Sequence, residues 1–367
     1  MRQILLLAIG ILFLSCGQDR ASLTEQKRIH TIDSTFTKLF NDGEFNGNIL
    51  VAEKGKVIFE KSFGLANELT KEKLNSNSVF DLSALSGQFT AMAIVILKEQ
   101  GKLTYDDKMS KYIPELSYYG NITVRNLLNQ TSGLPPYYPL LDSLFDKKNI
   151  ATNKDVIELY AKHRPKILFE PNTKCKGGEV GYVMLASIIE KVSGKTYAEF
   201  LSESIFKPLK MNNSFVYTRR LTPKKIDNYA YGYIYSPVLE KNILPDSIKS
   251  LKYVIWLDGI VGDGGVNSTT ADLLKWDRAL YTTALVSEAC LKEIYTPATL
   301  LNQTKTNYGF GWNIENTENS GKIVWHDGSW PGYVSHIERH LDDDKTIIIL
   351  QNKDNGYIPI IGYTLLF

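Results

Sequence analysis

The sequence predicts an α/β (α+β) protein in which both ends of the chain build one antiparallel sheet and the middle forms a mostly helical insert. Three observations predict this fold. Residues 47–63 have the pattern of a hairpin, the segment after Tyr308 breaks into short strand-like runs, and the middle consists of helical segments separated by turn clusters. Strands and helices in this order are typical of a sheet covered by helices.

The composition narrows the function classes. The chain has 367 residues, of which 43% are hydrophobic and 22% charged, so collagen, low-complexity disorder and a multi-span membrane protein are excluded. The net charge is only +2, so no strong field attracts polyanions and we expect no nucleic-acid partner. Three cysteines form no disulfide framework, and five histidines do not indicate a metal site. We therefore expect no metal and no cofactor.

The N-terminus has the pattern of an export signal. Arg2 precedes an apolar run, Ile4 to Leu14, which is too short to span a bilayer. Ser15-Cys16-Gly17 follows and resembles the lipobox of a bacterial lipoprotein. This implies a signal peptide at residues 1–16, lipid attached to Cys16 and a short tether at residues 17–24. A plain secretory signal is the alternative. We expect a cell-envelope protein, periplasmic or outer-membrane facing, that meets the membrane only through a lipid anchor.

Hydrophobic spacing predicts the first elements in turn. Leu23 to Leu39 has apolar residues three and four apart and predicts a helix. Gly47 to Ala52 and Val57 to Phe63 flank Gly55-Lys56 and predict a hairpin. A second helical face follows, closed by Gly101, and is formed by Leu85, Phe89, Met92 and Ile96.

The later elements follow the same reasoning. Val183 to Val192 predicts an amphipathic helix that ends at Ser193-Gly194. Asp342 to Asp344 predicts a solvated turn, and Ile358 to Leu366 a last helix. The four expected strands are Gly309 to Ile314, Lys322 to Trp325, Tyr333 to Arg339 and Thr346 to Leu350. We expect one domain at 25–367, with a sheet lobe at about 25–105 and 298–367 and a helical lobe at about 106–297.

Seven stretches resemble one family. They are 46–52 with 61–64, FDLSALSGQFTAMA (80–93), ITVRNLLNQTSGLP (122–135), GYVMLASIIEKVSGKTY (181–197), GDGGVNSTTADLLKW (262–276), YGFGW (308–312) and HDGSWPGY (326–333). Together, and in this order, they resemble the β-lactamase-related serine hydrolases, which include class C β-lactamases, D,D-peptidases and other proteins with a penicillin-binding-protein-like fold. The resemblance implies that fold and three catalytic motifs.

The first motif of that family, Ser-x-x-Lys, is lost. Phe80 and Gln88-Phe89-Thr90 hold the family register, which places Ala84 at the nucleophile position and Gly87 at the lysine position. Alanine cannot form an acyl-enzyme, and glycine cannot accept the serine proton. Ser83 and Ser86 are neighbours, but helical geometry turns their hydroxyls away from the direction of Ala84.

The second motif, Tyr-x-Asn, is also lost, and the third survives. Between Pro171 and Tyr182 the register places Gly177 at the tyrosine position and Glu179 at the asparagine position. The third motif remains as His326-Asp327-Gly328. With nucleophile and base both absent, only binding and electrostatic contributions to catalysis would remain. We therefore expect a catalytically inactive member of the family.

The first hypothesis is a retained pocket that binds a peptide, a cell-wall fragment or a small ligand. Small residues at Ala84, Gly87, Gly177 and Gly178 predict a wide pocket, and aromatic and carboxylate groups suit a sugar or a peptide amine. The candidate lining residues are Ala84, Glu179, His326, Asp327, Gly328 and Trp330, with Tyr137 on the rim.

Two other hypotheses remain open. One is a hydrolase of β-lactamase, D,D-peptidase or esterase type that works through a rewired site around Glu179 and His326, assisted by Asp327 or Asp263 and by Lys174 or Lys176. The other is a structural scaffold lipoprotein, for which side chains would fill the cleft below Ala84. His336 and His340 have the spacing of a zinc helix but fall in an expected strand. Whether Cys175 and Cys290 pair is also open.

Overall fold

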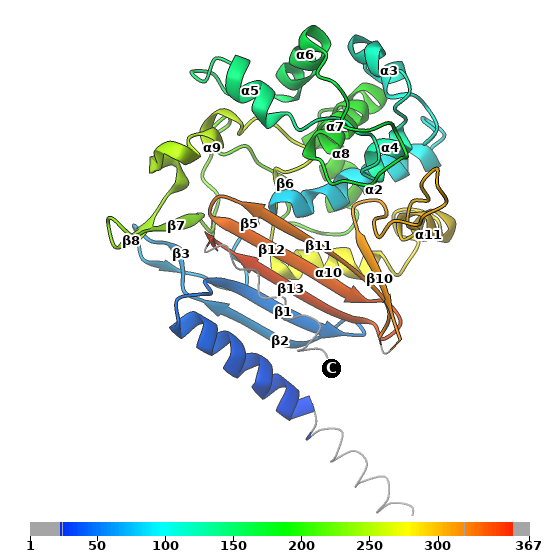
Figure 1. Ribbon diagram of the computed structural model, residues 1–367. Helices are drawn as coiled ribbons and strands as arrows, with labels where there is room; N and C mark the ends of the chain where they lie inside the picture. The colour runs from blue at the N-terminus through cyan, green and yellow to red at the C-terminus, as the bar shows by residue number, and fades with distance from the viewer. Residues whose placement is uncertain (1–22, 24, 319, 355–367) are drawn as a thin grey trace, which may run out of the picture. The chain divides into compact units, whose positions relative to one another are not determined.

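The computed structural model describes residues 23, 25–318 and 320–354, and these contain both helices and strands (Figure 1). The expected signal peptide, the lipid site Cys16 and the last helix at Ile358 to Leu366 lie outside the described residues. The chain divides into two compact units, and Asn46–Ile358 is the larger. The smaller unit holds a helix at residues 25–41, in which Ile32 and Phe36 are buried as the spacing predicts. No helix among the described residues is long and apolar enough to cross a bilayer.

The larger unit is built on a six-stranded antiparallel sheet with the order β10-β11-β12-β13-β1-β2, as expected for chain ends that meet in one sheet. β1 pairs with both β2 and β13, so the first and last thirds of the chain are joined within one sheet. The strands are β1 Gly47–Glu53, β2 Lys56–Phe63, β10 Asn313–Thr317, β11 Gly321–Trp330, β12 Tyr333–His340 and β13 Lys345–Gln351.

Eight short strands complete the β-structure. They form a two-stranded sheet β3-β4 and two three-stranded sheets, β5-β9-β6 and β14-β7-β8. Their bounds are β3 Leu65–Asn67, β4 Glu72–Lys73, β5 Phe80–Asp81, β6 Phe215–Val216, β7 Tyr233–Ser236, β8 Lys241–Ile243, β9 Val266–Ser268 and β14 Lys353–Asp354. The sequence did not predict the hairpin β7–β8, which lies within the expected helical insert.

The helices of the larger unit lie mostly between β5 and β10, as predicted. They are α2 Gly87–Glu99, α3 Met109–Tyr112, α4 Val124–Leu128, α5 Tyr138–Leu144, α6 Asn153–His163, α7 Glu179–Ser193, α8 Tyr197–Leu201, α9 Tyr253–Trp256, α10 Thr270–Ala279 and α11 Glu288–Ile294. Short 3-10 and π turns are η1 Ser83–Ser86, η2 Pro114–Tyr119, η3 Ser202–Phe206, η4 Pro245–Ser247 and η5 Lys249–Leu251.

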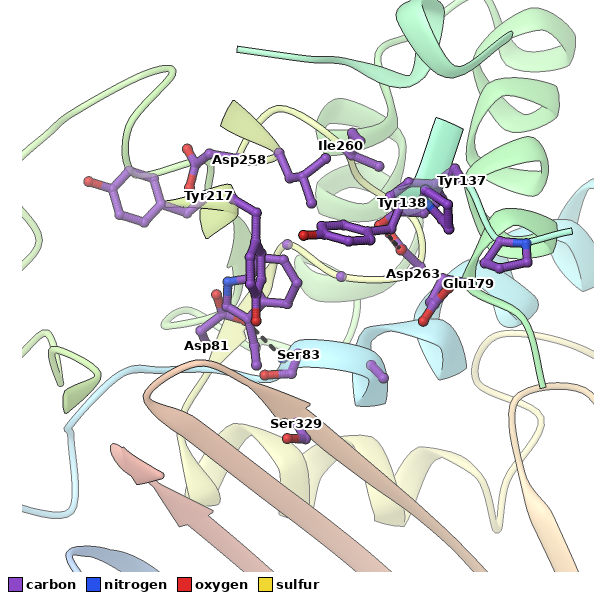
Figure 2. Close-up of a pocket in the computed structure, with 18 residues that line it drawn as sticks. Asp81, Ser83, Tyr137, Tyr138, Glu179, Tyr217, Asp258, Ile260, Asp263 and Ser329 are labelled. Atoms are coloured by element: carbon purple, nitrogen blue, oxygen red, sulfur yellow. Dashed lines mark hydrogen bonds between the residues drawn. The ribbon is translucent and has the colours of Figure 1, made fainter. Parts of the chain in front are cut away.

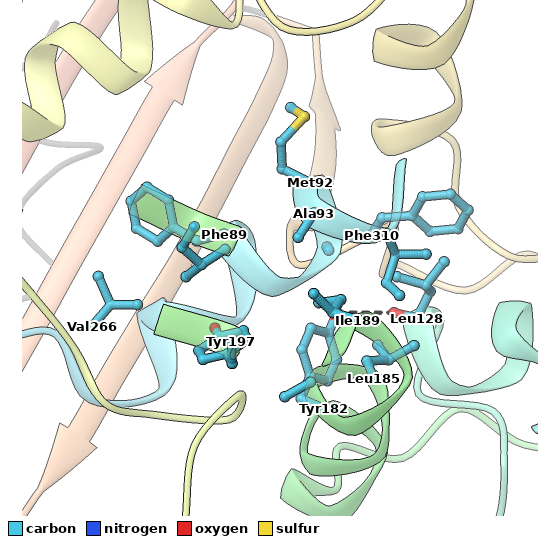
Figure 3. Close-up of a cluster of buried hydrophobic side chains, with 14 of the residues drawn as sticks. Phe89, Met92, Ala93, Leu128, Tyr182, Leu185, Ile189, Tyr197, Val266 and Phe310 are labelled. Carbon is cyan, nitrogen blue, oxygen red and sulfur yellow. Dashed lines mark hydrogen bonds between the residues drawn. The ribbon is translucent and has the colours of Figure 1, made fainter. Parts of the chain in front are cut away.

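Helix α2 is the centre of the hydrophobic core (Figure 3). Its residues from Gly87 to Leu97 are all buried, so the helix is buried on every side rather than on the one face that the spacing predicted. The ring of Phe89 lies 4.6 Å from that of Trp276 on α10 and 5.5 Å from that of Phe206, measured between centroids. Because α10 packs on β1 and β13, this contact joins α2 to the sheet.

The end of α7 follows the prediction, and its start differs. The helix ends at Ser193, and Gly194 follows with a φ of 70°, the left-handed conformation that commonly closes helices. It begins at Glu179, four residues before the expected start at Val183, and the added turn contains the buried residues Val180 and Tyr182. The lobe division at residues 105 and 298 stays a prediction. Since α10 covers the sheet, part of the insert belongs to the sheet side.

Candidate functional site

The floor of the site is the turn η1, which precedes α2. Ser83 has a φ of 52°, and its N–H donates to Asp81 Oδ1 at 2.8 Å, so the chain turns sharply between β5 and η1. Ser335 on β12 donates its hydroxyl to the carbonyl oxygen of Leu82 at 2.7 Å, which fixes η1 to the sheet. Ala84 is exposed and points its methyl group into a pocket, as the family register predicted for the nucleophile position.

Gly328 allows this close packing of η1 on β11. A Cβ at residue 328 would collide with the carbonyl oxygen of Leu82 and with Ser335 Oγ, and would lie 3.0 Å from the backbone nitrogen of Leu85. Glycine is therefore required at this position for steric reasons. Gly328 packs against the η1 turn and does not line the pocket, although the sequence analysis placed it among the lining residues.

The space beside Gly87 is filled by Tyr182 of α7. A Cβ at Gly87 would lie 3.1 Å from Tyr182 Cε1, which is tighter than ordinary van der Waals contact. The Tyr182 hydroxyl donates to the carbonyl oxygen of Leu128 at 3.0 Å, and this bond holds the ring in place. Gly87 is buried and does not widen the pocket, contrary to the expectation from its size.

His326 belongs to this tyrosine cluster rather than to the pocket. Its Nδ1 lies 2.7 Å from the carbonyl oxygen of Asp327, which only accepts, so Nδ1 carries the proton. Its Nε2 then accepts from the Tyr308 hydroxyl, at 3.2 Å. Burial lowers the pKa of His326, so the imidazole is neutral. His326 does not line the pocket that Ala84 lines, which corrects the expected pocket-facing position.

Asp327 does not line the pocket either, and its carboxylate is bonded on the sheet instead. Its Oδ1 lies 2.5 Å from Nδ1 of His336, the residue opposite it on β12. Burial opposes the charge on His336, but hydrogen bonds to Asp327 and Glu338 outweigh it and raise the pKa of His336 to about 9. His340 also bonds Glu338, at 2.6 Å. These histidines form a buried ion-paired row on β12, and Asp327 is not a pocket residue.

Glu179 lines the pocket, as the sequence predicted, from the first residue of α7. It is exposed, and the preceding Gly178 donates its N–H to Gln130 Oε1 at 2.9 Å. A Cβ at Gly177 or Gly178 would meet no atom within 4 Å, so this side is open as their small size predicted. Neither Lys174 nor Lys176 lines the pocket, although both are exposed.

The pocket has a volume of about 580 Å³, which is within the range of small-molecule sites. Its walls come from elements far apart in the sequence, as Figure 2 shows. The aromatic lining residues are Tyr137, Tyr138, Tyr217, Tyr253 and Trp330, and the acidic ones are Asp81, Glu179, Asp258 and Asp263. Ser83 also lines it. Its positive φ takes it out of regular helical geometry.

Two of the carboxyl groups have raised pKa values. Burial raises the pKa of Asp81 to about 6. Burial, together with the charge of Glu179, raises the pKa of Asp263 to about 7, although the Tyr137 hydroxyl donates to Asp263 Oδ2 at 2.7 Å. Asp258 forms an ion pair, in which its Oδ1 accepts from Arg220 Nη1 at 2.9 Å. The sequence analysis did not predict Asp81 or Asp258 as pocket residues. For Asp263, the glycines on either side of it in the sequence were the available signal.

The two remaining cysteines do not bond to each other. Cys175 is partly buried beside the carbonyl oxygen of Asn129, and Cys290 is buried near Lys98. Both are free thiols, which settles the pairing that the sequence left open.

An antiparallel sheet joined by both chain ends, with a pocket at the start of a buried central helix, defines a protein of the β-lactamase-like class. The Beta-lactamase family model matches residues 32–357, and the chain belongs to that family. The chain is 43% identical over 332 residues to penicillin-binding protein 4* of Bacillus subtilis (strain 168), covering 90% of this chain and 73% of that protein. It is 24% identical over 341 residues to protein flp of Staphylococcus aureus (strain MW2), covering 89% of this chain and 64% of that protein, less than two thirds of its length.

Solved structures share the fold. A penicillin-binding protein from Bacillus halodurans superposes with a TM-score of 0.75 at 24% identity, covering 90% of this chain and 96% of that one. The octameric penicillin-binding protein homologue from Pyrococcus abyssi has a TM-score of 0.77 at 25% identity, covering 92% of this chain and 77% of that one. These likenesses confirm the predicted fold class.

Proposed function

We propose that this protein is a non-hydrolysing member of the Beta-lactamase family whose pocket binds a ligand without forming an acyl-enzyme. One observation carries the proposal: the exposed methyl group of Ala84 stands at the floor of an open pocket of about 580 Å³. The register assigns this position to the nucleophile. A relative is named for penicillin binding, but a methyl group has no oxygen to acylate. The ligand class is a peptide, a cell-wall fragment or another small molecule.

The surroundings of Ala84 support the loss of chemistry. The register assigns Gly87 to the general base, and the ring of Tyr182 occupies the space beside it. Gly177, at the position assigned to the tyrosine, carries no hydroxyl and borders open space. Removing a nucleophile and its base together leaves only the contributions of binding and electrostatics.

The geometry gives less support to the two alternatives. A rewired hydrolase needs Glu179 and His326 in one site, but Glu179 lines the pocket while His326 bonds Tyr308 outside it. A scaffold with a filled cleft would leave no space above Ala84, and the cleft is open.

The test uses a lipid-free form of the chain that starts at residue 17, and a fluorescent penicillin, with nitrocefin and short acyl esters as further substrates. We expect neither a covalent adduct nor turnover. An adduct, or turnover that disappears in the Glu179→Gln variant, would overturn the proposal in favour of an active hydrolase. Ligand binding is measured separately, by the chemical-shift changes that pocket residues show with peptidoglycan stem peptides.

The location is part of the same proposal. We propose export to the cell envelope and a lipid on Cys16, because the signal pattern at residues 1–16 ends at that cysteine. Labelling with an alkyne fatty acid in a bacterial host tests it. The Cys16→Ala variant should lose the label, and Cys175→Ala, which also removes one thiol, should keep it. Label that persists in Cys16→Ala would contradict lipidation.

A further inference from the structure

Three pocket carboxylates have no cationic partner. Asp81, Glu179 and Asp263 line the same cavity, and within the described part of the chain none of them forms an ion pair. Asp258 is neutralised by Arg220, so it does not add to this excess. Lysine, arginine and histidine are absent from the described lining residues. The cavity therefore has a negative field and offers no positive group of its own.

Two of the three are grouped at one end of the pocket. Figure 2 shows Glu179 and Asp263 beside Tyr137, on the side opposite Asp81, Tyr217 and Asp258. The charge of Glu179 disfavours ionisation of Asp263, so the two carboxyl groups repel each other. Arg219 and Arg220 partly offset the charge of Asp81 at the other end, whereas no cation among the described residues is a cause of the pKa shift of Asp263. A bound cation would remove this repulsion.

An aromatic wall faces the same cavity. The rings of Tyr138 and Tyr253 meet edge to face at 5.4 Å, and those of Tyr253 and Trp330 at 5.5 Å. Three elements, α5, α9 and β11, thus supply one continuous apolar surface that also attracts cations through the ring faces. Such a surface suits the body of a small organic molecule.

A separate observation also indicates a ligand. Ser83 lines the pocket and is only 4% exposed, yet its hydroxyl has no hydrogen-bond partner among the described residues. A buried hydroxyl without a partner costs free energy. A polar group on a bound molecule, reached after a small rotation of the side chain, would satisfy it.

We infer that the pocket binds a peptide or amino-acid derivative with a free ammonium group, held by Glu179 and Asp263 while its apolar body lies on Tyr138, Tyr253 and Trp330. This inference rests on the proposed function and names the ligand class for that pocket. No bond is made or broken: the ligand binds as a cation and leaves unchanged.

The test compares 2-phenylethylamine with 2-phenylethanol, two probes of equal shape that differ in charge, by NMR titration of the same lipid-free chain near neutral pH. We expect the amine to bind about tenfold more tightly, from one ion pair and one cation–π contact. Glu179→Gln should weaken amine binding about fivefold and leave the alcohol unchanged. Glu179 is exposed, so this variant should fold. Glu115→Gln removes the same charge from an exposed site outside the pocket and should change neither.

The outcomes separate the two proposals. Equal binding of amine and alcohol would overturn the ammonium inference while the pocket stays a binding site. Binding of neither probe would overturn the inference as well. Turnover of penicillin would overturn the proposal that hydrolysis is lost, but it would not affect the inference that the pocket prefers the amine. A loss of affinity in Glu115→Gln equal to that in Glu179→Gln would show a general charge effect and overturn the assignment of the site.

Discussion

The aromatic ring of Tyr182 lies against the backbone of Gly87, so that a Cβ at residue 87 would stand only 3.1 Å from Tyr182 Cε1. The two residues belong to α7 and α2, the helices that pack together at the centre of the protein. Because the Tyr182 hydroxyl is bonded to the carbonyl oxygen of Leu128, the ring has little freedom to retreat. Any side chain added at residue 87 therefore meets a fixed neighbour.

Substitution of Gly87 tests this contact. Alanine normally stabilises a helix by about 1 kcal/mol relative to glycine, but here the steric conflict should dominate. We expect Gly87→Ala to lower the free energy of unfolding by about 1 kcal/mol, measured by urea denaturation. In the Tyr182→Leu background the same change should be neutral or stabilising. A stabilised Gly87→Ala single variant would show that the ring moves freely.

Binding of the amine probe should depend on pH. Asp263 attracts a cation only when ionised, and its pKa of about 7 leaves it mostly protonated in mild acid. We expect affinity for 2-phenylethylamine to rise about tenfold between about pH 5 and about pH 8, since the amine stays protonated throughout.

Other ionisable groups surround the two carboxyl groups that titrate. Those that face Asp263 are Tyr137, Glu179 and Tyr197. Those around Asp81 are Asp258, Arg219, Arg220, Tyr229 and Tyr333.

The Asp263→Asn variant serves as the control for that pH dependence. Asparagine keeps an acceptor for the Tyr137 hydroxyl and removes the titration, so the rise near pH 7 should flatten and leave only the part due to Asp81 near pH 6. An unchanged pH profile in this variant would mean that another group controls binding.

A buried ion pair holds α10 on the sheet. Arg339 Nε of β12 donates to Asp277 Oδ1 at 2.5 Å, and both charged side chains are fully buried. The Thr346 hydroxyl of β13 donates to the same oxygen at 2.8 Å. Asp277→Ala leaves the guanidinium buried and unpaired, so we expect a loss of about 3–5 kcal/mol in urea denaturation. Glu115→Gln should change stability by less than about 0.5 kcal/mol. A small effect of Asp277→Ala would show that water reaches Arg339.

Tyr308→Phe separates structure from binding. The change removes the hydroxyl that donates a hydrogen bond to His326 Nε2. A buried acceptor left without a partner lowers stability by about 1–3 kcal/mol. We expect a comparable loss of stability and unchanged binding of the amine probe, because neither His326 nor Tyr308 lines the pocket. Altered binding with unchanged stability would instead place His326 in the binding site.

The strand and helix patterns predicted much of the fold. Hydrophobic spacing located β1, β2, β11, β12 and β13, together with the end of α7 at Gly194. Two of the last strands differ from the prediction, because β10 begins at Asn313 rather than at Gly309 and β11 ends at Trp330 rather than at Trp325. Gly311 has a φ of 77° and passes close to the backbone of Gln88, so these residues form a turn. The expected solvated turn at 342–344 also carries an ion pair, from Asp344 to Arg278.

By itself, the sequence determined the family, the antiparallel sheet and the residues Ala84, Glu179 and Trp330 of the pocket, because motif register and side-chain periodicity are local properties of the chain. Tertiary structure alone decided that Tyr182 fills the space beside Gly87, that His326 and Asp327 do not line the pocket, and that Asp81, Asp258 and Asp263 gather around it. Asp81 and Asp263, which line the same pocket, are 182 positions apart in the sequence. The proximity of the pocket residues, and the raised pKa values of Asp81 and Asp263, follow from packing and burial, which no local pattern records.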